Sequence, residues 1–279
     1  MVTTMNTSYS KFDWISTSLQ YNDNSHEIQS FKVFSLPSKI KSKKVIHILH
    51  GYTESCHYMN PFIDFFLEKD FEVMCLELPN HGSSSGKRYD IDNFETYLLH
   101  IEAYTKTLDK NREHYFIAHS TGAVGITKYL KKYKASPFKK IFLISPLTRP
   151  IFYSMIKFSI PMLSKMINKV KRIEQIRGPE YTQARETDEH YYGYLPLNWT
   201  LNCINFVEKQ TENPTKDINN VVSIFGTGDR IIDASDGFTK YSKWFPNSNV
   251  HMIEGGQHHL HFAPSEVKHE FFDIIDSYL

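Results

Sequence analysis

The chain has 279 residues, with 32 basic and 31 acidic side chains and a formal net charge of +1 when histidines are counted as neutral. Hydrophobic residues make up 41% and charged residues 23%, so the chain can bury a core and lacks the composition of a disordered protein. The balanced charge supplies no overall basic field, which argues against nucleic acid as a partner.

Three widely spaced cysteines, Cys56, Cys75 and Cys203, form no C-x-x-C pair, so they indicate neither a disulfide framework nor a cysteine zinc site. Residues 1–16 lack the basic start and the apolar run of a signal peptide. No stretch reaches the roughly 18 consecutive apolar residues that a membrane span needs. We therefore expect a cytoplasmic protein that would touch a membrane only at its surface.

Short apolar runs alternate with longer helical patterns along most of the chain. Residues 12–36 predict two hairpin-like edge strands. The predicted core strands, rich in β-branched and aromatic residues, are 44–49, 71–78, 115–118, 141–144, 221–225 and 250–253. The predicted helices are 60–69, 92–111, 122–133, 235–244 and 264–279. This alternation predicts an α/β fold, with a mostly parallel central sheet and helices on both faces.

One region breaks the alternation. From about residue 148 to residue 208 no convincing strand pattern appears, so we predict a mostly helical cap insertion at 148–208 between two parts of the core, 1–147 and 209–279. The first half of the cap is basic and rich in Met and Phe. Such a segment suits an anionic lipid surface, an adaptable acyl pocket, or simple packing of the cap onto the core, and these alternatives stay open.

Two five-residue segments resemble the G-x-S-x-G motif of a nucleophile elbow, in which a sharp strand-to-helix turn exposes a serine hydroxyl. The literal match, GSSSG at 82–86, has loop-forming residues on both sides of Ser84. The altered match, AHSTG at 118–122, has a predicted strand before it and a predicted helix after it. We therefore select Ser120 as the candidate nucleophile, against the alternative of an ordinary strand-to-helix turn.

A serine nucleophile needs a base, and the base needs an orienting carboxylate; in this architecture the chain order is serine, acid, histidine. Asp229 follows a predicted core strand, at the sheet edge where open α/β folds bind ligands. Asp233 and Asp236 compete for the acid role. Both better fit the first turn of the next helix, where carboxylates complement the helix dipole.

The base is expected after the last strand, where the sequence reads GGQHHLH at 255–261. We select His258, the first histidine after the glycines, and expect His259 and His261 to be polar surface residues. Three close histidines could bind a metal, but no cysteine or H-E-x-x-H spacing supports one, so we expect none. His119 is expected to pack beside Ser120 rather than act as its base.

Backbone N–H groups are expected to form the oxyanion hole. Gly51 follows a predicted strand and lets the chain turn, so that the N–H of Tyr52 can point at the site. The second candidate donor is the N–H of Thr121, at the start of the helix that follows Ser120. The alternative for the His-Gly pair at 50–51 is a plain turn.

Together these segments resemble the α/β-hydrolase superfamily, and more narrowly its lysophospholipase and monoacylglycerol lipase group, also described as serine aminopeptidase-like. The matching words are LHGYTES at 49–55, ELPNHGSSSGKR at 77–88, AHSTGAVG at 118–125, GTGDRIID at 226–233 and EGGQHHLH at 254–261. YYGYLPLNWTLN at 191–202 is similar to the cap of bacterial lysophospholipases associated with the inner membrane.

The resemblance implies Ser120 as nucleophile, Asp229 as acid, His258 as base, and Tyr52 and Thr121 as oxyanion donors. It also implies a structural role for the GSSSG loop. Two residues depart from the family pattern. Ala118 stands where the family usually has glycine, which could narrow the elbow and lower activity. Glu77 stands where aspartate is common, at a strand end where we expect it to matter less.

The resulting hypothesis is a serine hydrolase that cleaves the ester of a lysophospholipid or monoacylglycerol without a cofactor, in contact with the inner membrane surface through its cap. Substrate-binding residues and oligomeric state are not indicated. One alternative is an aminopeptidase or amidase, which needs carboxylates in the cap to bind a free amine. The candidates for that role are Glu174, Glu180, Glu186, Asp188 and Glu189. The other alternative is a catalytically weak hydrolase fold that binds lipid.

Overall fold

A computed structural model describes residues 14–22, 28–37, 42–172, 179–211 and 213–279. The predicted start of the N-terminal hairpin at Phe12 and the cap residue Glu174 lie outside these ranges. Among the described residues, no helix combines the length and the apolarity that crossing a membrane requires.

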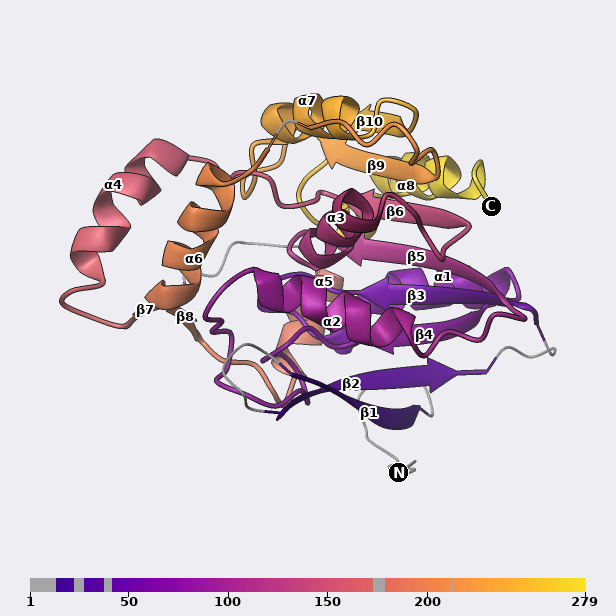
Figure 1. The fold of residues 1–279 in the computed structure, drawn as a ribbon, viewed down its shortest axis with the longest axis horizontal. Coiled ribbons are helices and arrows are strands. Elements are labelled where there is room, and N and C mark those ends of the chain that lie inside the picture. The colour runs from indigo at the N-terminus through magenta and orange to yellow at the C-terminus, as the bar shows by residue number, and fades with distance from the viewer. Residues whose placement is uncertain (1–13, 23–27, 38–41, 173–178, 212) are drawn as a thin grey trace.

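The core is an eight-stranded sheet in the order β1-β2-β4-β3-β5-β6-β9-β10 (Figure 1). The first two strands pair antiparallel with each other and β2 pairs antiparallel with β4, while the other neighbours are parallel. The strands are β1 Ile15–Asn22, β2 Ile28–Leu36, β3 Lys44–Leu49, β4 Glu72–Leu76, β5 Glu113–His119, β6 Lys140–Ile144, β9 Val221–Gly226 and β10 Asn249–Ile253. The predicted fold class is confirmed.

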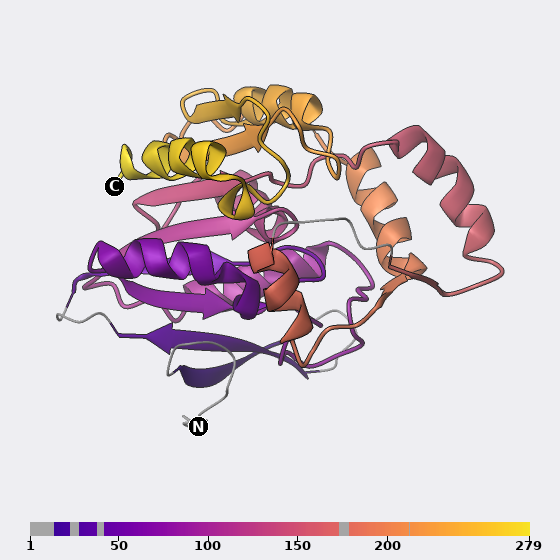
Figure 2. The same ribbon diagram turned by 180° about the vertical axis from the view of Figure 1, so that it is seen from behind.

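Helices cover both faces of the sheet because its inner strands are apolar on both sides. In β5, for example, Phe116 and Ala118 belong to one buried cluster, while Tyr115 and Ile117 belong to the other. Figures 1 and 2 show α2 Glu95–Thr105, α3 Gly122–Tyr133 and α7 Ala234–Trp244 over one face, and α1 Asn60–Glu68 and α8 Ser265–Asp276 over the other. Two short 3₁₀ helices, η1 Cys56–Met59 and η2 Leu260–Phe262, complete the core.

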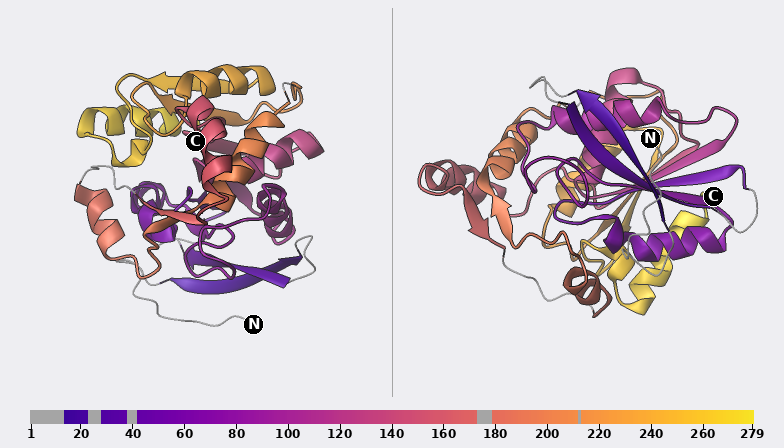
Figure 3. Two further views of the ribbon diagram at one scale, coloured as in Figure 1. Left: turned by 90° about the vertical axis from the view of Figure 1, so that its left-hand side faces the viewer. Right: turned by 90° about the horizontal axis from the view of Figure 1, so that it is seen from below.

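The segment between β6 and β9 holds α4 Tyr153–Leu163, β7 Lys169–Lys171, α5 Pro179–Glu186, β8 Tyr194–Pro196 and α6 Leu197–Glu208. Figures 1 and 3 show α4 and α6 standing beside the sheet, whereas α5 lies against the core, where Tyr181 is buried. This segment also contains a strand pair that the sequence pattern does not predict, since β7 and β8 pair antiparallel. Each has three residues, too few to produce an alternating pattern. The division at 148–208 remains a proposal.

The parallel topology brings the functional candidates together. The loops that follow β3, β5, β9 and β10 carry Tyr52, Ser120, Asp229 and His258. Because these strands are parallel, all four loops lie at the same edge of the sheet, beyond the carboxyl ends of the strands.

Candidate active site

Ser120 occupies a strained turn between β5 and α3. Its φ of 50° is in the left-handed region, and its N–H donates to the carbonyl oxygen of Ile144 at 2.8 Å. Helix and strand pass so close that a Cβ at Gly122 would lie 2.4 Å from the carbonyl oxygen of His50. Ala118 is fully buried in the core, and the turn forms with its methyl group in place.

His258 links the candidate nucleophile to a carboxylate. Its Nε2 lies 3.0 Å from Oγ of Ser120, and its Nδ1 lies 2.7 Å from Oδ2 of Asp229. In the sequence, Asp229 lies 29 positions and Ser120 lies 138 positions from His258. In the structure, the three side chains form one continuous hydrogen-bonded chain. Both distances suit proton transfer from a hydroxyl to an imidazole held by a carboxylate.

The surroundings of Asp229 favour the ionised form of its carboxylate. Its second oxygen accepts hydrogen bonds from the N–H groups of Ile231 at 2.7 Å and Ile232 at 3.0 Å. Burial raises the pKa of Asp229, but the charge and hydrogen bond of His258 and the two N–H groups outweigh burial and hold the pKa below its ordinary value.

The competing aspartates have other partners. Asp233 caps α7 by accepting a hydrogen bond from the N–H of Asp236 at 3.0 Å. Both aspartates also pair with Arg149. Neither therefore takes the place of Asp229 beside His258.

Both candidate oxyanion donors face the same cavity as Ser120. Tyr52 and Thr121 line this cavity, and in the described part of the chain neither backbone N–H has a hydrogen-bond acceptor. Gly51 permits the close approach of its loop, since a Cβ there would lie 3.1 Å from Cβ of Ser120. The geometry leaves two N–H groups available beside the serine.

A cavity of about 310 Å³ opens above Ser120 and His258. Most of its wall is apolar and comes from the loops after β6 and β9 and from α4, β8 and α6. The apolar wall includes Leu147, Ile156, Leu195, Trp199, Ile204 and Ile231. Trp199 of α6 stacks on Tyr52, with ring centroids 3.7 Å apart and planes at 11°. The inserted segment is thereby attached to the candidate oxyanion loop.

The profile of the family described as "Serine aminopeptidase, S33" matches residues 40–265. The chain belongs to this family. The match confirms the predicted membership of the α/β-hydrolase superfamily and the prediction that the chain is an enzyme.

Individual relatives agree with this assignment. This chain is 23% identical over 255 residues to a monoglyceride lipase homolog of monkeypox virus, and the match covers 85% of this chain and 89% of the viral protein. A soluble variant of Saccharomyces cerevisiae monoglyceride lipase has a similar fold, with a TM-score of 0.72 and 15% identity over 93% of this chain and 94% of the other. Paleococcus ferrophilus monoacylglycerol lipase also has a similar fold, with a TM-score of 0.66 and 15% identity over 89% of this chain and 98% of the other.

The S33-family chain also has a buried polar network that sequence analysis missed. Glu54 is only 2% exposed, and its Oε2 accepts hydrogen bonds from the N–H of Gly51 at 2.8 Å and Nδ1 of His119 at 2.9 Å. Its Oε1 lies 2.7 Å from Nε2 of His259. Burial raises the pKa of Glu54, but the two histidines outweigh burial and hold it well below the ordinary value.

One expectation about nearby residues is wrong. His259 and His261 are buried, not surface residues, because they pack against His119 and the aromatic side chains of the core. Glu77 is fully buried at the end of β4, where it accepts hydrogen bonds from Nε2 of His50 at 2.8 Å and the N–H of Cys56 at 3.2 Å. This glutamate therefore connects the candidate oxyanion loop to β4.

Among the described residues, one group of side chains has the types and the spacing needed to bind a metal ion, namely Glu54, His119 and His259. One ligand atom from each lies within 4.8 Å of the others. These atoms already form hydrogen bonds with one another, so the carboxylate and both rings have partners without an ion. The absence of a metal remains a prediction.

Proposed function

We propose that this chain is a serine carboxylic-ester hydrolase in which Ser120 is the nucleophile, His258 the general base and Asp229 the orienting acid. The proposal rests on one observation above all, the hydrogen-bonded chain from Asp229 through His258 to Ser120 at the floor of an apolar cavity.

The reaction follows from these contacts. Oγ of Ser120 attacks the ester carbonyl carbon while its proton passes to Nε2 of His258, and Asp229 stabilises the imidazolium. The N–H groups of Tyr52 and Thr121 bind the carbonyl oxygen as it becomes negative. The tetrahedral intermediate collapses when His258 gives its proton to the departing alcohol, leaving an acyl group on Ser120.

Water completes the cycle. His258 removes a proton from a water molecule as its oxygen attacks the acyl carbon. The second intermediate collapses, the histidine returns the proton to Oγ of Ser120, and the carboxylic acid leaves. Every proton is thus carried by one imidazole, and the proposed reaction needs no cofactor.

The substrate is a lipid-like ester, either a monoacylglycerol or a lysophospholipid. An apolar wall of side chains from α4 and α6 suits an alkyl chain, and a volume of about 310 Å³ is at the lower end of typical ligand cavities. The similarity to proteins named monoglyceride lipases favours the same class.

The apolar residues of the cap divide between two roles. Ile156 of α4 lines the cavity, whereas none of the residues of α4 is buried. Phe158 is 77% exposed, and Phe152, Met155, Met162 and Met166 are also exposed. Exposed apolar side chains interspersed with Lys157 and Lys165 suit the surface of an anionic membrane, and we assign this face to peripheral membrane contact.

The amidase alternative has less support. Its free-amine substrate would need a carboxylate of the cap at the cavity. None of the four candidate carboxylates among the described residues lines the cavity. These candidates are Glu180, Glu186, Asp188 and Glu189. A lipid-binding module without catalysis would not require the contact between Ser120 and His258.

The test is hydrolysis of p-nitrophenyl esters of increasing acyl length, alongside monoacylglycerol, lysophosphatidylcholine and an amino-acid amide. Ser120→Ala is expected to abolish turnover and labelling by a fluorophosphonate. Ser84→Ala is the matched control because Oγ of Ser84 accepts a hydrogen bond from the backbone N–H of Lys32 at 3.3 Å and has no other hydrogen-bond partner among the described residues. This variant is expected to retain both turnover and labelling. Full turnover by Ser120→Ala, or loss in Ser84→Ala alone, would reject the assignment.

A further inference from the structure

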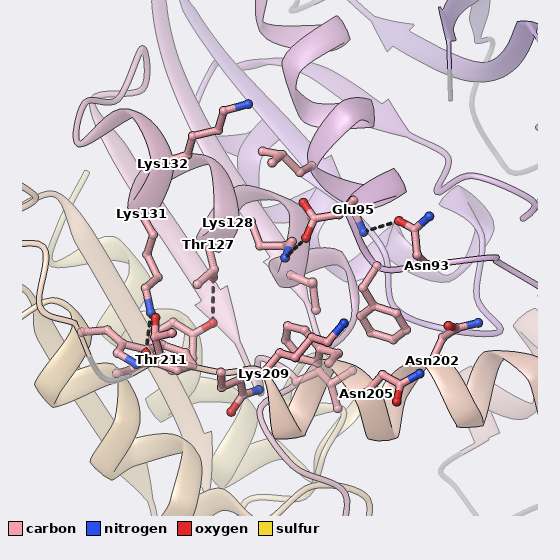
Figure 4. A pocket seen from close by; sticks show the side chains of 18 residues that line it. Asn93, Glu95, Thr127, Lys128, Lys131, Lys132, Asn202, Asn205, Lys209 and Thr211 are labelled. Atoms are coloured by element: carbon pink, nitrogen blue, oxygen red, sulfur yellow. Dashed lines mark hydrogen bonds and ion pairs between the residues drawn. The ribbon is translucent and has the colours of Figure 1, made fainter. Parts of the chain in front are cut away.

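A second cavity, of about 440 Å³, lies against other residues of α6 than those that line the candidate active site. Figure 4 shows the side chains that line it. It is bounded by α2, α3, α6 and α7. Asn202, Asn205, Phe206 and Lys209 of α6 line this cavity, whereas other residues of the same helix line the first. Leu147 lines both cavities, so a thin wall separates them. The proposed reaction uses none of the other residues of the second cavity.

One part of the second cavity is apolar and aromatic. Phe94 and Phe206 stack with ring centroids 4.9 Å apart, and Leu98, Val124 and Trp244 add further apolar surface. Nε1 of Trp244 is buried and has no hydrogen-bond partner among the described residues. This part can hold an alkyl chain, because it offers apolar contact with few polar atoms to desolvate.

The rest of the lining is strongly basic. It includes Lys128, Lys131, Lys132 and Lys209 against one carboxylate, Glu95. Glu95 pairs with Lys128 at 2.6 Å, and Lys132 pairs with Glu102 at 2.7 Å. Figure 4 shows the Lys132 side chain extending away from the other lysines.

The other two lysines have no acidic partner within the described ranges. Nζ of Lys131 bonds to the carbonyl oxygen of Thr211 at 2.7 Å and lies 4.3 Å from the ring centroid of Trp244. Burial, with a smaller contribution from Lys128, lowers the pKa of Lys131 to about 8. Lys209, near the end of α6, is exposed. An ammonium group in this position is stabilised by an anion that takes the place of water.

We propose that this cavity binds a single-chain amphiphilic anion, with its alkyl chain on Phe94, Phe206 and Trp244 and its carboxylate or phosphate head held by Lys131 and Lys209. A neutral amphiphile would satisfy the apolar part and leave both ammonium groups without a counter-charge. A small inorganic anion would leave the aromatic part in water. The site is separate from Ser120, so the proposal does not depend on the proposed function.

The test uses a dodecanoate analogue that carries a diazirine on its chain, followed by photolysis and peptide mapping. Expected adducts lie within 124–132 of α3 and within 202–211, which comprises the end of α6 and the three residues after it. Both dodecanoate and dodecyl phosphate are expected to suppress them. The stronger competitor identifies the head group. Dodecyltrimethylammonium, with the same chain and the opposite charge, is expected not to compete.

Two double variants complete the test. Lys131→Gln/Lys209→Gln is expected to lose at least tenfold in labelling at these peptides, while Lys110→Gln/Lys216→Gln removes two exposed charges elsewhere and is expected to label as the parent does. Circular dichroism checks that both fold. Adducts confined to 150–156 and 230–232, equal competition by the cationic amphiphile, or undiminished labelling of the first variant would each overturn the proposal. These adducts form without catalysis, so they are independent of turnover at Ser120.

Discussion

His119 bridges Glu54 and the backbone of the residue proposed as the catalytic base. Its Nδ1 lies 2.9 Å from a carboxylate oxygen of Glu54, and its Nε2 lies 3.1 Å from the carbonyl oxygen of His258. Both of these partners are hydrogen-bond acceptors when Glu54 is ionised, and its lowered pKa favours that form. His119 therefore links the buried carboxylate of Glu54 to the loop that carries His258.

Glu54 should therefore affect turnover without touching the substrate's reacting atoms. Glu54→Gln removes the charge that holds His119, His259 and the N–H of Gly51, so the loops that carry His258 and Tyr52 lose a common anchor. We expect kcat for ester hydrolysis to fall about ten- to hundredfold, or about 1.4 to 2.7 kcal/mol, with little change in KM.

Glu113→Gln is the control, because Glu113 pairs with Lys139 at the surface, away from the cavity. It is expected to leave kcat unchanged. Glu54→Asp, which keeps the charge, is expected to recover part of the activity. An unchanged kcat in Glu54→Gln would contradict the anchoring role.

The buried carboxylate of Glu54 also predicts that the stability of the fold depends on pH. Its folded-state pKa is lowered, so its contribution to stability is fully present above the unfolded-state pKa of about 4.3 and is lost as pH falls through the folded-state value. Urea unfolding should show Glu54→Gln well below the parent at pH 7, with the gap in free energy narrowing at pH 3.5. A gap that stays constant over this range would mean that the ionisation of Glu54 does not stabilise the fold.

Sequence patterns were sufficient where a short segment determines its own structure. The apolar runs around 44–49 and 221–225 predict β3 and β9 because a buried strand needs little more than continuous apolar side chains. The position of Ser120 follows from the strand before it and the helix after it.

Contacts distant in sequence could not be predicted in the same way. Glu54 meets His119 across 65 positions and His259 across 205. A single glutamate in a loop has the pattern of a solvent-exposed residue, and a run of histidines looks equally polar. Their burial follows from tertiary packing, which no local periodicity encodes. The buried contact of Glu77 could not be predicted for the same reason, since its partner His50 lies 27 positions away.

The tight passage of α3 past the loop after β3 gives a prediction about the elbow. Gly122→Ala would place a methyl carbon 2.4 Å from the carbonyl oxygen of His50. This oxygen belongs to the backbone, which cannot move aside as easily as the end of a flexible side chain. We expect a loss of about 1 to 3 kcal/mol in unfolding free energy and a larger loss of activity, because the shift moves the N–H of Thr121. Gly193→Ala, whose nearest neighbour would be 3.6 Å away, should be neutral in thermal unfolding and in turnover. Equal behaviour of the two variants would show that the elbow tolerates a side chain at 122.

The role of Asp229 can be separated from that of its neighbour Asp233 by removing one charge at a time. In Asp229→Asn the amide can donate a hydrogen bond to Nδ1 of His258, which moves the ring proton to Nε2, the atom that must accept the proton of Ser120. We expect kcat to fall by about three to four orders of magnitude while the fold is kept. In Asp233→Asn the new side chain still caps α7, since asparagine is as good a capping residue as aspartate, so kcat should stay within a factor of about two. Steady-state hydrolysis of a p-nitrophenyl ester by both variants decides the matter, and a severe loss in Asp233→Asn with full activity in Asp229→Asn would transfer the acid role to residue 233.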